Sequence, residues 1–286
     1  MPQRRAEART RRLRERFGGT HSVITGGSAG IGAAVGRRLV EVGGDVTLVA
    51  RHEDRLAETA ERLRGVREGA VVRTIVADVA DQAQISGALD EELSARPADL
   101  LVNSAGISHA GRLLETDPAT FRRVTDVDYL GTVWTTLAAV PHLRGREHAH
   151  IVNVASIVAL EGVYGYGAYA PSKFAVLAFS QVLRAELRPQ GVGVSVVLPP
   201  NTDTEMLEAE MRQLPAEMRP IHSTSRVLPP EAVADGLLAG VCSGRFEIIP
   251  GRDNRVLKRV HQVSPTPLRA SFDLMVRREL RRQRRA

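Results

Sequence analysis

The sequence is poor in cysteine, in aromatic residues and in long apolar runs. A single cysteine, Cys242, excludes an intrachain disulfide framework and a cysteine-based zinc site, and we expect no bound metal. No apolar run approaches the roughly 18 residues that span a bilayer. The N-terminal arginines are not followed by the apolar stretch of a secretory signal. These absences predict a cytoplasmic protein, and 286 residues are enough to bury a full core.

The net charge of +6 is concentrated at the two ends of the chain. Residues 1–16 carry seven arginines against two glutamates, and residues 277–286 carry six arginines against one glutamate. The body between them is therefore net acidic. Solvated, partly disordered ends explain this pattern, and peripheral contact with an anionic membrane surface is the main functional alternative. We expect no nucleic-acid partner, because the ends show neither interleaved aromatic residues nor a DNA-reading motif.

Short β-branched runs alternate with longer helical patterns along the body. The expected strands are 21–25, 45–50, 70–77, 99–103, 150–156, 192–198 and 246–250. The expected helices are 31–43, 53–64, 82–95, 118–140, 168–188 and 230–241. Apolar strands separated by helices predict an α/β fold: a Rossmann-type, doubly wound, seven-stranded and mostly parallel sheet with helices on both faces.

One domain accounts for nearly all of the chain. We place it at residues 19–252, between a basic N-terminal tail (1–18) and an amphipathic, basic C-terminal tail (253–286). The stretch 199–228 contains four prolines and mixed polarity, which favour a substrate loop over core.

A glycine-rich turn follows the first expected strand. In "TGGSAGIG", Gly26, Gly30 and Gly32 open the next helix. Residues without a Cβ let backbone N–H groups and the helix N-terminus approach a pyrophosphate. The position between a strand and an amphipathic helix predicts a dinucleotide site, although the spacing is not Gly-x-Gly-x-x-Gly.

The end of the second strand predicts which dinucleotide binds. An acidic residue there would hold the ribose 2′-hydroxyl of NAD, but this chain has Arg51. A guanidinium can bind a 2′-phosphate with two hydrogen bonds, so Arg51 favours NADPH (NADP⁺). The alternative is that Arg51 only cooperates with Glu53 at the start of a surface helix.

Three of the four tyrosines lie at 164–169, and only Tyr169 has a lysine four residues on, Lys173. On a helix this spacing places both side chains on one face. A neighbouring ammonium stabilises a phenolate and lowers the pKa of a tyrosine towards the working range. Ser156, thirteen residues upstream at a strand end, could hold a carbonyl oxygen while Tyr169 delivers a proton.

Residues 20–250 resemble the short-chain dehydrogenase/reductase family. "TGGSAGIG" resembles its cofactor turn, "ADV" its adenine-contacting pair and "NSAG" its strand-four motif, while Ser156, Tyr169 and Lys173 match its catalytic positions. With the glycines and Arg51, the cofactor-binding residues that the resemblance implies, Tyr169 and Lys173 among them, are Ser28, Ile31, Asp78, Val79, Asn103, Ala105, Gly106, Pro199, Thr202 and Thr204.

One position departs from the family pattern. The family usually has an asparagine where this chain has Asp128, and that asparagine's backbone carbonyl holds a water which links the lysine to solvent. A backbone role could survive the change. A carboxylate could instead pair with Lys173 and weaken its effect on Tyr169, which would shift the pH profile.

Four stretches are similar to one branch of that family, the 3-ketodihydrosphingosine reductases. They are "VTLVARHEDRL", "AYAPSKFAV", "LPPNTDTEM" and "SFDLMVRREL". The resemblance implies NADPH-dependent reduction of a lipid ketone, and dimers or tetramers built on the helices at 118–140 and 168–188. The eukaryotic members carry membrane-spanning segments that this chain lacks, and its basic tails could instead dock it on the inner face of a membrane. The side chains that we expect to form the apolar wall of a pocket for the acyl chain are Leu160, Val163, Tyr164, Met206 and Leu207.

Two other functions stay open at this point. One is a related ketoreductase that acts on a 3-oxoacyl thioester, a polyketide or another lipid ketone. The other is a cofactor-sensing binding protein whose chemistry has been lost, a reading that the intact Ser156, Tyr169 and Lys173 set argues against.

Overall fold

A seven-stranded parallel sheet forms the centre of the molecule in a computed structural model, which describes residues 2–223 and 226–284. The strand order is β3-β2-β1-β4-β5-β6-β7, so the chain reverses its direction of travel between β1 and β4. The strands are β1 (His21–Thr25), β2 (Asp45–Ala50), β3 (Val72–Val76), β4 (Leu100–Asn103), β5 (His150–Val154), β6 (Gly193–Val197) and β7 (Glu247–Ile248). The predicted doubly wound fold is confirmed, with every strand parallel.

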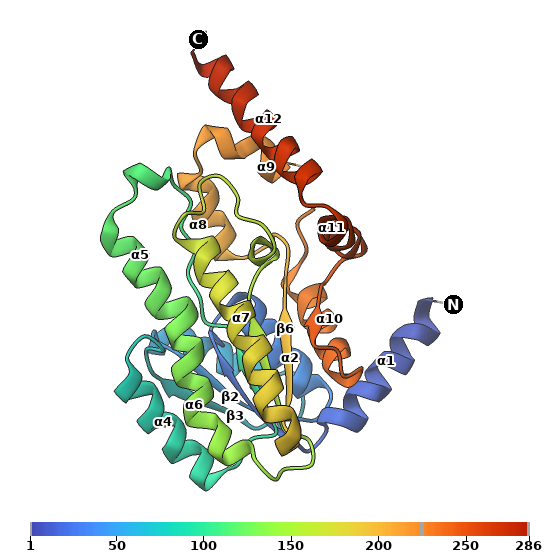
Figure 1. The fold of residues 1–286 in the computed structure, drawn as a ribbon. Helices are drawn as coiled ribbons and strands as arrows, with labels where there is room; N and C mark the ends of the chain where they lie inside the picture. The colour runs from blue at the N-terminus through green and yellow to red at the C-terminus, as the bar shows by residue number, and fades with distance from the viewer. Residues whose placement is uncertain (1, 224–225, 285–286) are drawn as a thin grey trace.

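Helices cover both faces of the sheet (Figure 1). One layer contains α2 (Gly30–Glu41), α3 (Glu53–Arg64) and α10 (Pro230–Cys242). The other contains α4 (Gln82–Ala95), α5 (Pro118–Val124), α6 (Gly131–Leu143) and α7 (Tyr169–Leu187). Each layer encloses its own apolar core against the sheet, because strands buried on both faces need apolar partners on each side.

The N-terminal segment is not a solvated tail in the structure. Residues 2–17 form helix α1 (Pro2–Phe17), which packs against α10. Leu13 is 1% exposed and Phe17 is 0% exposed, and both belong to the main hydrophobic core. The arginine content of the segment concealed these two apolar positions, which are one helical turn apart and so share a face.

The expected helix at 118–140 is interrupted. Between α5 and α6 the backbone widens into the π-helical turn η2 (Thr125–Leu130), which contains Asp128. Such turns insert an extra residue and re-aim the side chains within them. Asp128 is fully buried as a result.

The remaining segments gather at the carboxyl end of the sheet (Figure 1). Within the expected loop 199–228 lie α8 (Glu205–Gln213) and α9 (Arg219–Ser223). The C-terminal region forms α11 (Arg252–Val263) and α12 (Thr266–Gln283), and α12 packs on α9. None of the described helices is both long enough and apolar enough to cross a membrane.

Candidate active site

The glycine turn lies where β1 ends, at the point where the sheet reverses its strand order. Gly26 has φ +66°, and a Cβ on it would lie 2.7 Å from the Ser104 carbonyl oxygen. A Cβ on Gly32 would lie 2.3 Å from the Gly26 carbonyl oxygen. Only glycine fits these two positions. Thr25 Oγ1 accepts hydrogen bonds from the Ser104 and Ala105 N–H groups, both at 3.2 Å, which fixes the turn to the end of β4.

The N-terminus of α2 faces the cleft without a side-chain cap. Ala29 precedes the helix and offers no hydrogen-bond acceptor to its first N–H groups. Uncapped N–H groups at a helix start bind phosphate, aided by the helix dipole. The turn therefore fits the pyrophosphate of a dinucleotide.

Two arginines line the other end of this cleft. Arg51 follows β2, and its Nη1 lies 3.5 Å from Oδ2 of Asp78, which follows β3. Arg55, on α3, also lines the cleft and forms an ion pair with Glu205. Arg55 was missed in the sequence, although it lies four residues after Arg51. Two guanidiniums beside the expected ribose site favour a ligand with an additional phosphate there.

Ser156, Tyr169 and Lys173 come together at the carboxyl end of β5. Ser156 follows this strand, Tyr169 begins α7, and Lys173 lies one turn further along the helix. The Ser156 hydroxyl acts on the Tyr169 phenol and lowers its pKa. Lys173 Nζ lies 5.5 Å from the centre of the Tyr169 ring. All three residues line the same cleft as the glycine turn, which has a volume of about 360 Å³.

Lys173 forms a buried ion pair with Asp128. Its Nζ lies 3.3 Å from Asp128 Oδ2, and the two side chains are 6% and 0% exposed. Asp128 also accepts hydrogen bonds from the Ile107 N–H at 2.8 Å and from Ser172 Oγ at 3.1 Å. Burial raises the pKa of Asp128, and the Lys173 ammonium opposes that rise. The carboxylate therefore holds both the lysine and the loop that follows β4.

The electrostatics around Tyr169 differ from the sequence-based expectation. We expected Lys173 to lower the pKa of Tyr169, but the pKa is raised. Burial of the phenol is the main cause, and the carboxylates of Asp128 and Glu210 add to it, while the hydrogen bond with Ser156 opposes it. The ion pair with Asp128 weakens the effect of the Lys173 ammonium on the phenol, so the lysine does not outweigh these causes.

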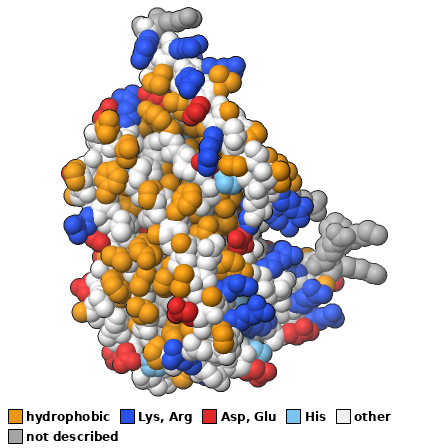
Figure 2. Space-filling model, viewed as in Figure 1, with side chains coloured by type: hydrophobic (Ala, Val, Ile, Leu, Met, Phe, Trp, Pro, Cys, Tyr) orange, Lys and Arg blue, Asp and Glu red, His pale blue; other side chains and the backbone are white. Residues whose placement is uncertain are grey.

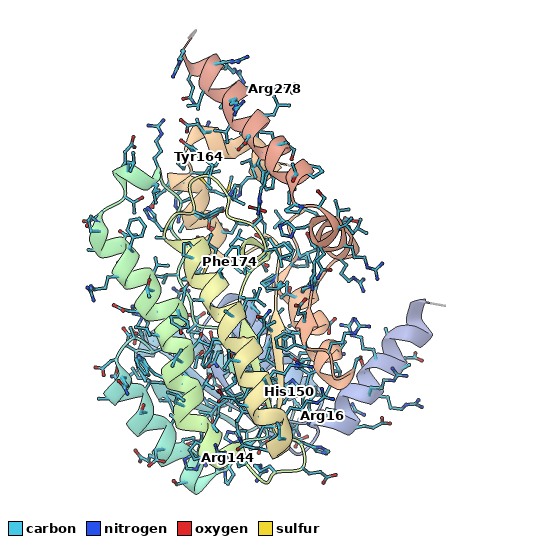
Figure 3. All side chains as sticks on the ribbon, in the orientation of Figure 1. Arg16, Arg144, His150, Tyr164, Phe174 and Arg278 are labelled. Atoms are coloured by element: carbon cyan, nitrogen blue, oxygen red, sulfur yellow. The ribbon has the colours of Figure 1, made fainter. Side chains whose placement is uncertain are left out.

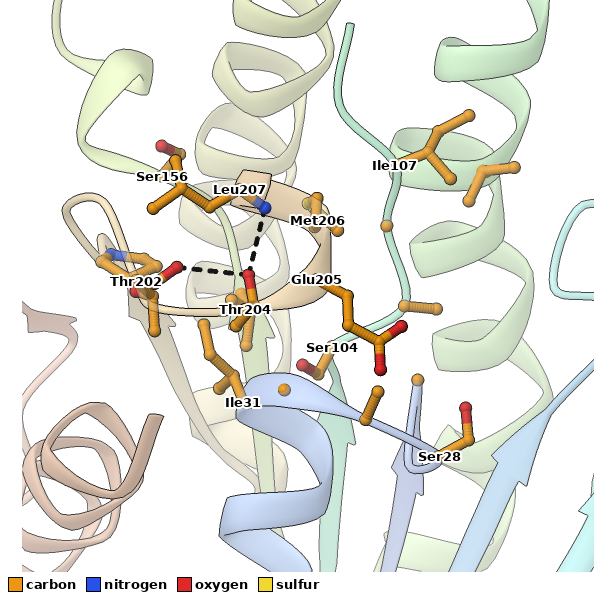
Figure 4. Close-up of a pocket in the computed structure, with 18 of the residues that line it drawn as sticks. Ser28, Ile31, Ser104, Ile107, Ser156, Thr202, Thr204, Glu205, Met206 and Leu207 are labelled. Carbon is orange, nitrogen blue, oxygen red and sulfur yellow. Dashed lines mark hydrogen bonds between the residues drawn. The ribbon is translucent and has the colours of Figure 1, made fainter. Parts of the chain in front are cut away.

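Most of the expected cofactor residues line the cleft. Figure 4 shows four of them, Ser28, Ile31, Thr202 and Thr204, among the residues that line it. The others that line it are Gly26, Gly30, Arg51, Val79, Ala105, Gly106, Pro199, Tyr169 and Lys173.

Three expected cofactor residues lie outside the cleft wall, and each supports it. Gly32 packs beneath the glycine turn, and Asp78 pairs with Arg51. Asn103 is buried, and its Nδ2 donates to Thr136 Oγ1 at 2.9 Å and to Asn153 Oδ1 at 2.8 Å.

The expected substrate residues divide into two groups. Met206 and Leu207, on α8, line the cleft, whereas Leu160, Val163 and Tyr164 do not. The chain between β5 and α7 turns these three side chains away: Leu160 and Val163 pack against small apolar clusters, and Tyr164 is partly exposed (Figure 3). Tyr166, two residues after Tyr164, lines the cleft instead.

A polar cluster beside Tyr169 was missed in the sequence. The Tyr166 hydroxyl donates to Glu210, on α8, and lies 2.6 Å from His222 Nε2, on α9. Ser108 Oγ also donates to Glu210. Its members lie up to 114 residues apart in the chain, between Ser108 and His222, so no local spacing reveals the cluster.

Helix α8 contacts both ends of the cleft. Thr204 caps it, because its Oγ1 accepts a hydrogen bond from the Leu207 N–H at 3.3 Å (Figure 4). The first helical residue, Glu205, pairs with Arg55 on the dinucleotide side, and Glu210 contacts Tyr166 on the catalytic side.

Comparisons with known proteins agree with this geometry. Residues 20–215 match the family model for short chain dehydrogenase. The chain is 34% identical over 243 residues to a 3-ketodihydrosphingosine reductase of Bos taurus, a match that covers 84% of this chain and 73% of that protein.

Two solved structures illustrate the similarity in fold. One is a short chain dehydrogenase/reductase from Burkholderia phymatum in complex with NAD, with a TM-score of 0.78 and 26% identity over 88% of this chain and 96% of that chain. The other is a short-chain dehydrogenase from Sphingobium yanoikuyae in complex with NADPH, with a TM-score of 0.74 and 26% identity over 88% and 95% of the two chains.

Proposed function

The chain belongs to the short chain dehydrogenase family, and from this membership we propose that it is an NADPH-dependent reductase that converts 3-ketodihydrosphingosine to dihydrosphingosine. The observation that supports ketone reduction is that Ser156, Tyr169 and Lys173 lie together in the cleft that begins at the glycine turn. The similarity to the Bos taurus reductase, over most of both chains, supports the substrate.

The choice of NADPH rests on this chain's own residues. The two structural relatives described above bind NAD and NADPH respectively, so the fold alone does not decide between them. Arg51 and Arg55 line the cleft where β2 ends, and the residue that directly follows β2 is not acidic. These guanidiniums would hold a 2′-phosphate, and the N-terminus of α2 would hold the pyrophosphate.

The chain's residues would supply the proton and stabilise the developing charge. When bound, the nicotinamide supplies the hydride that reduces the carbonyl carbon. The Tyr169 hydroxyl donates its proton to the carbonyl oxygen, and the Ser156 hydroxyl donates a hydrogen bond to the same oxygen as negative charge develops on it. Lys173 stabilises the phenolate that remains, and Asp128 holds Lys173 in place.

An apolar surface supports the proposal that the chain forms dimers or tetramers. Leu137 on α6, with Phe174 and Val182 on α7, is exposed on the outer face of these helices. Figure 2 shows hydrophobic side chains gathered over this face, and Figure 3 places Phe174 on it. Burying these side chains against a second copy would remove apolar area from water.

A second surface supports the proposal of peripheral membrane contact. Along α11, Val256, Val260 and Val263 are exposed at helical spacing, and Arg255 and Arg259 are exposed beside them. An amphipathic helix with basic residues binds an anionic bilayer in the plane of its surface. A substrate that is dissolved in the bilayer could then enter the cleft without first passing into water.

Oxidation of NADPH in the presence of 3-ketodihydrosphingosine in detergent micelles tests the main proposal. We expect turnover with NADPH, turnover slower by about tenfold or more with NADH, and loss of that preference in Arg51→Ala. Tyr169→Phe should lower kcat by about 100-fold or more, because it removes the proton donor. Turnover of a 3-oxoacyl thioester alone would move the assignment to a related ketoreductase, and NADPH binding without any turnover would favour a cofactor sensor.

The pH dependence of this reaction tests the role of Asp128. Reduction needs the protonated phenol, so the rate falls once the pH exceeds the pKa of Tyr169. The Asp128 carboxylate raises that pKa, and Asp128→Asn should therefore move the falling limb to lower pH. Asp126→Asn, in the same π-helical turn, is the control. Superimposable curves for the natural chain and Asp128→Asn would contradict the role.

The molar mass in solution, measured by light scattering, tests the assembly. We expect a dimer or tetramer for the natural chain and monomers for Leu137→Glu/Val182→Glu, because a buried unpaired carboxylate costs more than the interface gains. A monomeric natural chain would rule out the proposal.

Sedimentation with vesicles tests the membrane contact. The full chain should bind phosphatidylserine-containing vesicles, and Val256→Ser/Val260→Ser/Val263→Ser should bind them several-fold more weakly. Point variants are used because truncation of the N-terminus would remove Leu13 and Phe17 from the core. Equal binding of both proteins, or of neutral and anionic vesicles, would refute the contact.

A further inference from the structure

A buried carboxylate that pairs with no described lysine or arginine lies beside the reacting group. The Glu210 side chain is only 7% exposed, yet it lines the same cleft as Ser156 and Tyr169. Its charge also contributes to the raised pKa of Tyr169. The Tyr166 ring links the two, with its centre 5.7 Å from the Tyr169 ring and its hydroxyl on Glu210.

The groups that hold this carboxylate in place are neutral donors. The Tyr166 hydroxyl donates to one oxygen and the Ser108 hydroxyl to the other. These contacts fix the direction of the carboxylate without cancelling its charge.

The only ion-pair partner within the described chain is a histidine. His222 Nε2 lies 3.6 Å from Glu210 Oε1, and burial lowers the pKa of His222. Both ring nitrogens of this histidine have other hydrogen-bond partners: Nε2 contacts the Tyr166 hydroxyl, and Nδ1 contacts Asn201 Nδ2 at 3.4 Å. Among the side chains that the structure describes, no lysine or arginine pairs with Glu210.

An oriented carboxylate removed from water is stabilised by a cation. We propose that Glu210 is the counter-ion for a primary ammonium group on the substrate carbon adjacent to the carbonyl that Tyr169 protonates. The inference rests on the proposed ketone reduction. It adds to that proposal the feature of the substrate that this cleft selects. The chemical class is a 2-amino ketone; a 3-oxoacyl thioester has no such cation.

The ammonium would also assist the reaction. A positive charge beside the carbonyl carbon stabilises the negative charge that develops on its oxygen. It would also offset the effect of Glu210 on Tyr169, so that the phenol loses its proton more readily when the cationic substrate is present than when a neutral ketone is. Glu210 would thus disfavour substrates that lack an amine, because their binding leaves the carboxylate without a partner.

Two ketones that differ only in the amine test the proposal. The natural chain should reduce 3-ketodihydrosphingosine with a kcat/KM at least about 30-fold above that for 1-hydroxyoctadecan-3-one, as for the loss of one partner of a buried charge pair. Glu210→Gln, which keeps the shape of the side chain, should lose most of this preference by lowering kcat/KM for the amino ketone alone. The control is Glu208→Gln, an exposed position on the same helix, which should behave as the natural chain.

Equal reduction of both ketones by the natural chain would overturn the inference and leave the proposed function intact. An equal loss for both ketones in Glu210→Gln would also overturn it, since that result indicates a structural role.

A binding measurement separates this inference from the proposed function. In calorimetric titrations of the full chain, octylamine should bind at least about tenfold more tightly than 1-octanol, and Glu210→Gln should remove the difference. If 3-ketodihydrosphingosine is not reduced but this difference is present, the proposed function fails and the ammonium site stands. If the amine and the alcohol bind equally well to the natural chain, the ammonium site is overturned whatever the enzyme reduces.

Discussion

The buried ion pair between Asp128 and Lys173 is the contact on which the catalytic geometry depends. It joins the π-helical turn before α6 to the second turn of α7, and its carboxylate also holds the Ile107 N–H of the loop after β4. Two charges removed from water are stable only when they pair closely and satisfy their other hydrogen bonds. Loss of either partner would leave the other charge buried without a counter-ion. It would also break the contacts that hold together the π-helical turn, α7 and the loop after β4, which form the cleft jointly.

The sheet and the dinucleotide turn could be predicted from the sequence because their signals are local. Strand 45–50 and helices 53–64 and 82–95 were expected at the residues where the structure has them. The glycines of the turn show in the sequence itself where the backbone has no room for a Cβ atom. These patterns depend on residues that are close together in the sequence, so the sequence alone is enough to predict them.

What could not be predicted depends on contacts between distant segments. The π-helical turn at Asp128 interrupts an apolar pattern that continues through it, so the periodicity indicated one uninterrupted helix. Leu13 and Phe17 were concealed by the arginines around them, because net charge reports composition and not which face of a helix is buried. Glu210 lies in the stretch 199–228, which we expected to be a substrate loop, and its partners Tyr166 and Ser108 are far away in the sequence.

Helix α8 gives the two ends of the cleft a common support. Glu205 at its start is bound to Arg55 on the dinucleotide side, and Glu210, five residues later, is bound to Tyr166 on the catalytic side. A helix of this length moves as one body, so a ligand that draws Arg55 away from Glu205 also acts on the position of Glu210. The affinities at the two ends are then linked, and linkage is reciprocal: the factor by which the dinucleotide changes the affinity for the ketone equals the factor by which the ketone changes the affinity for the dinucleotide.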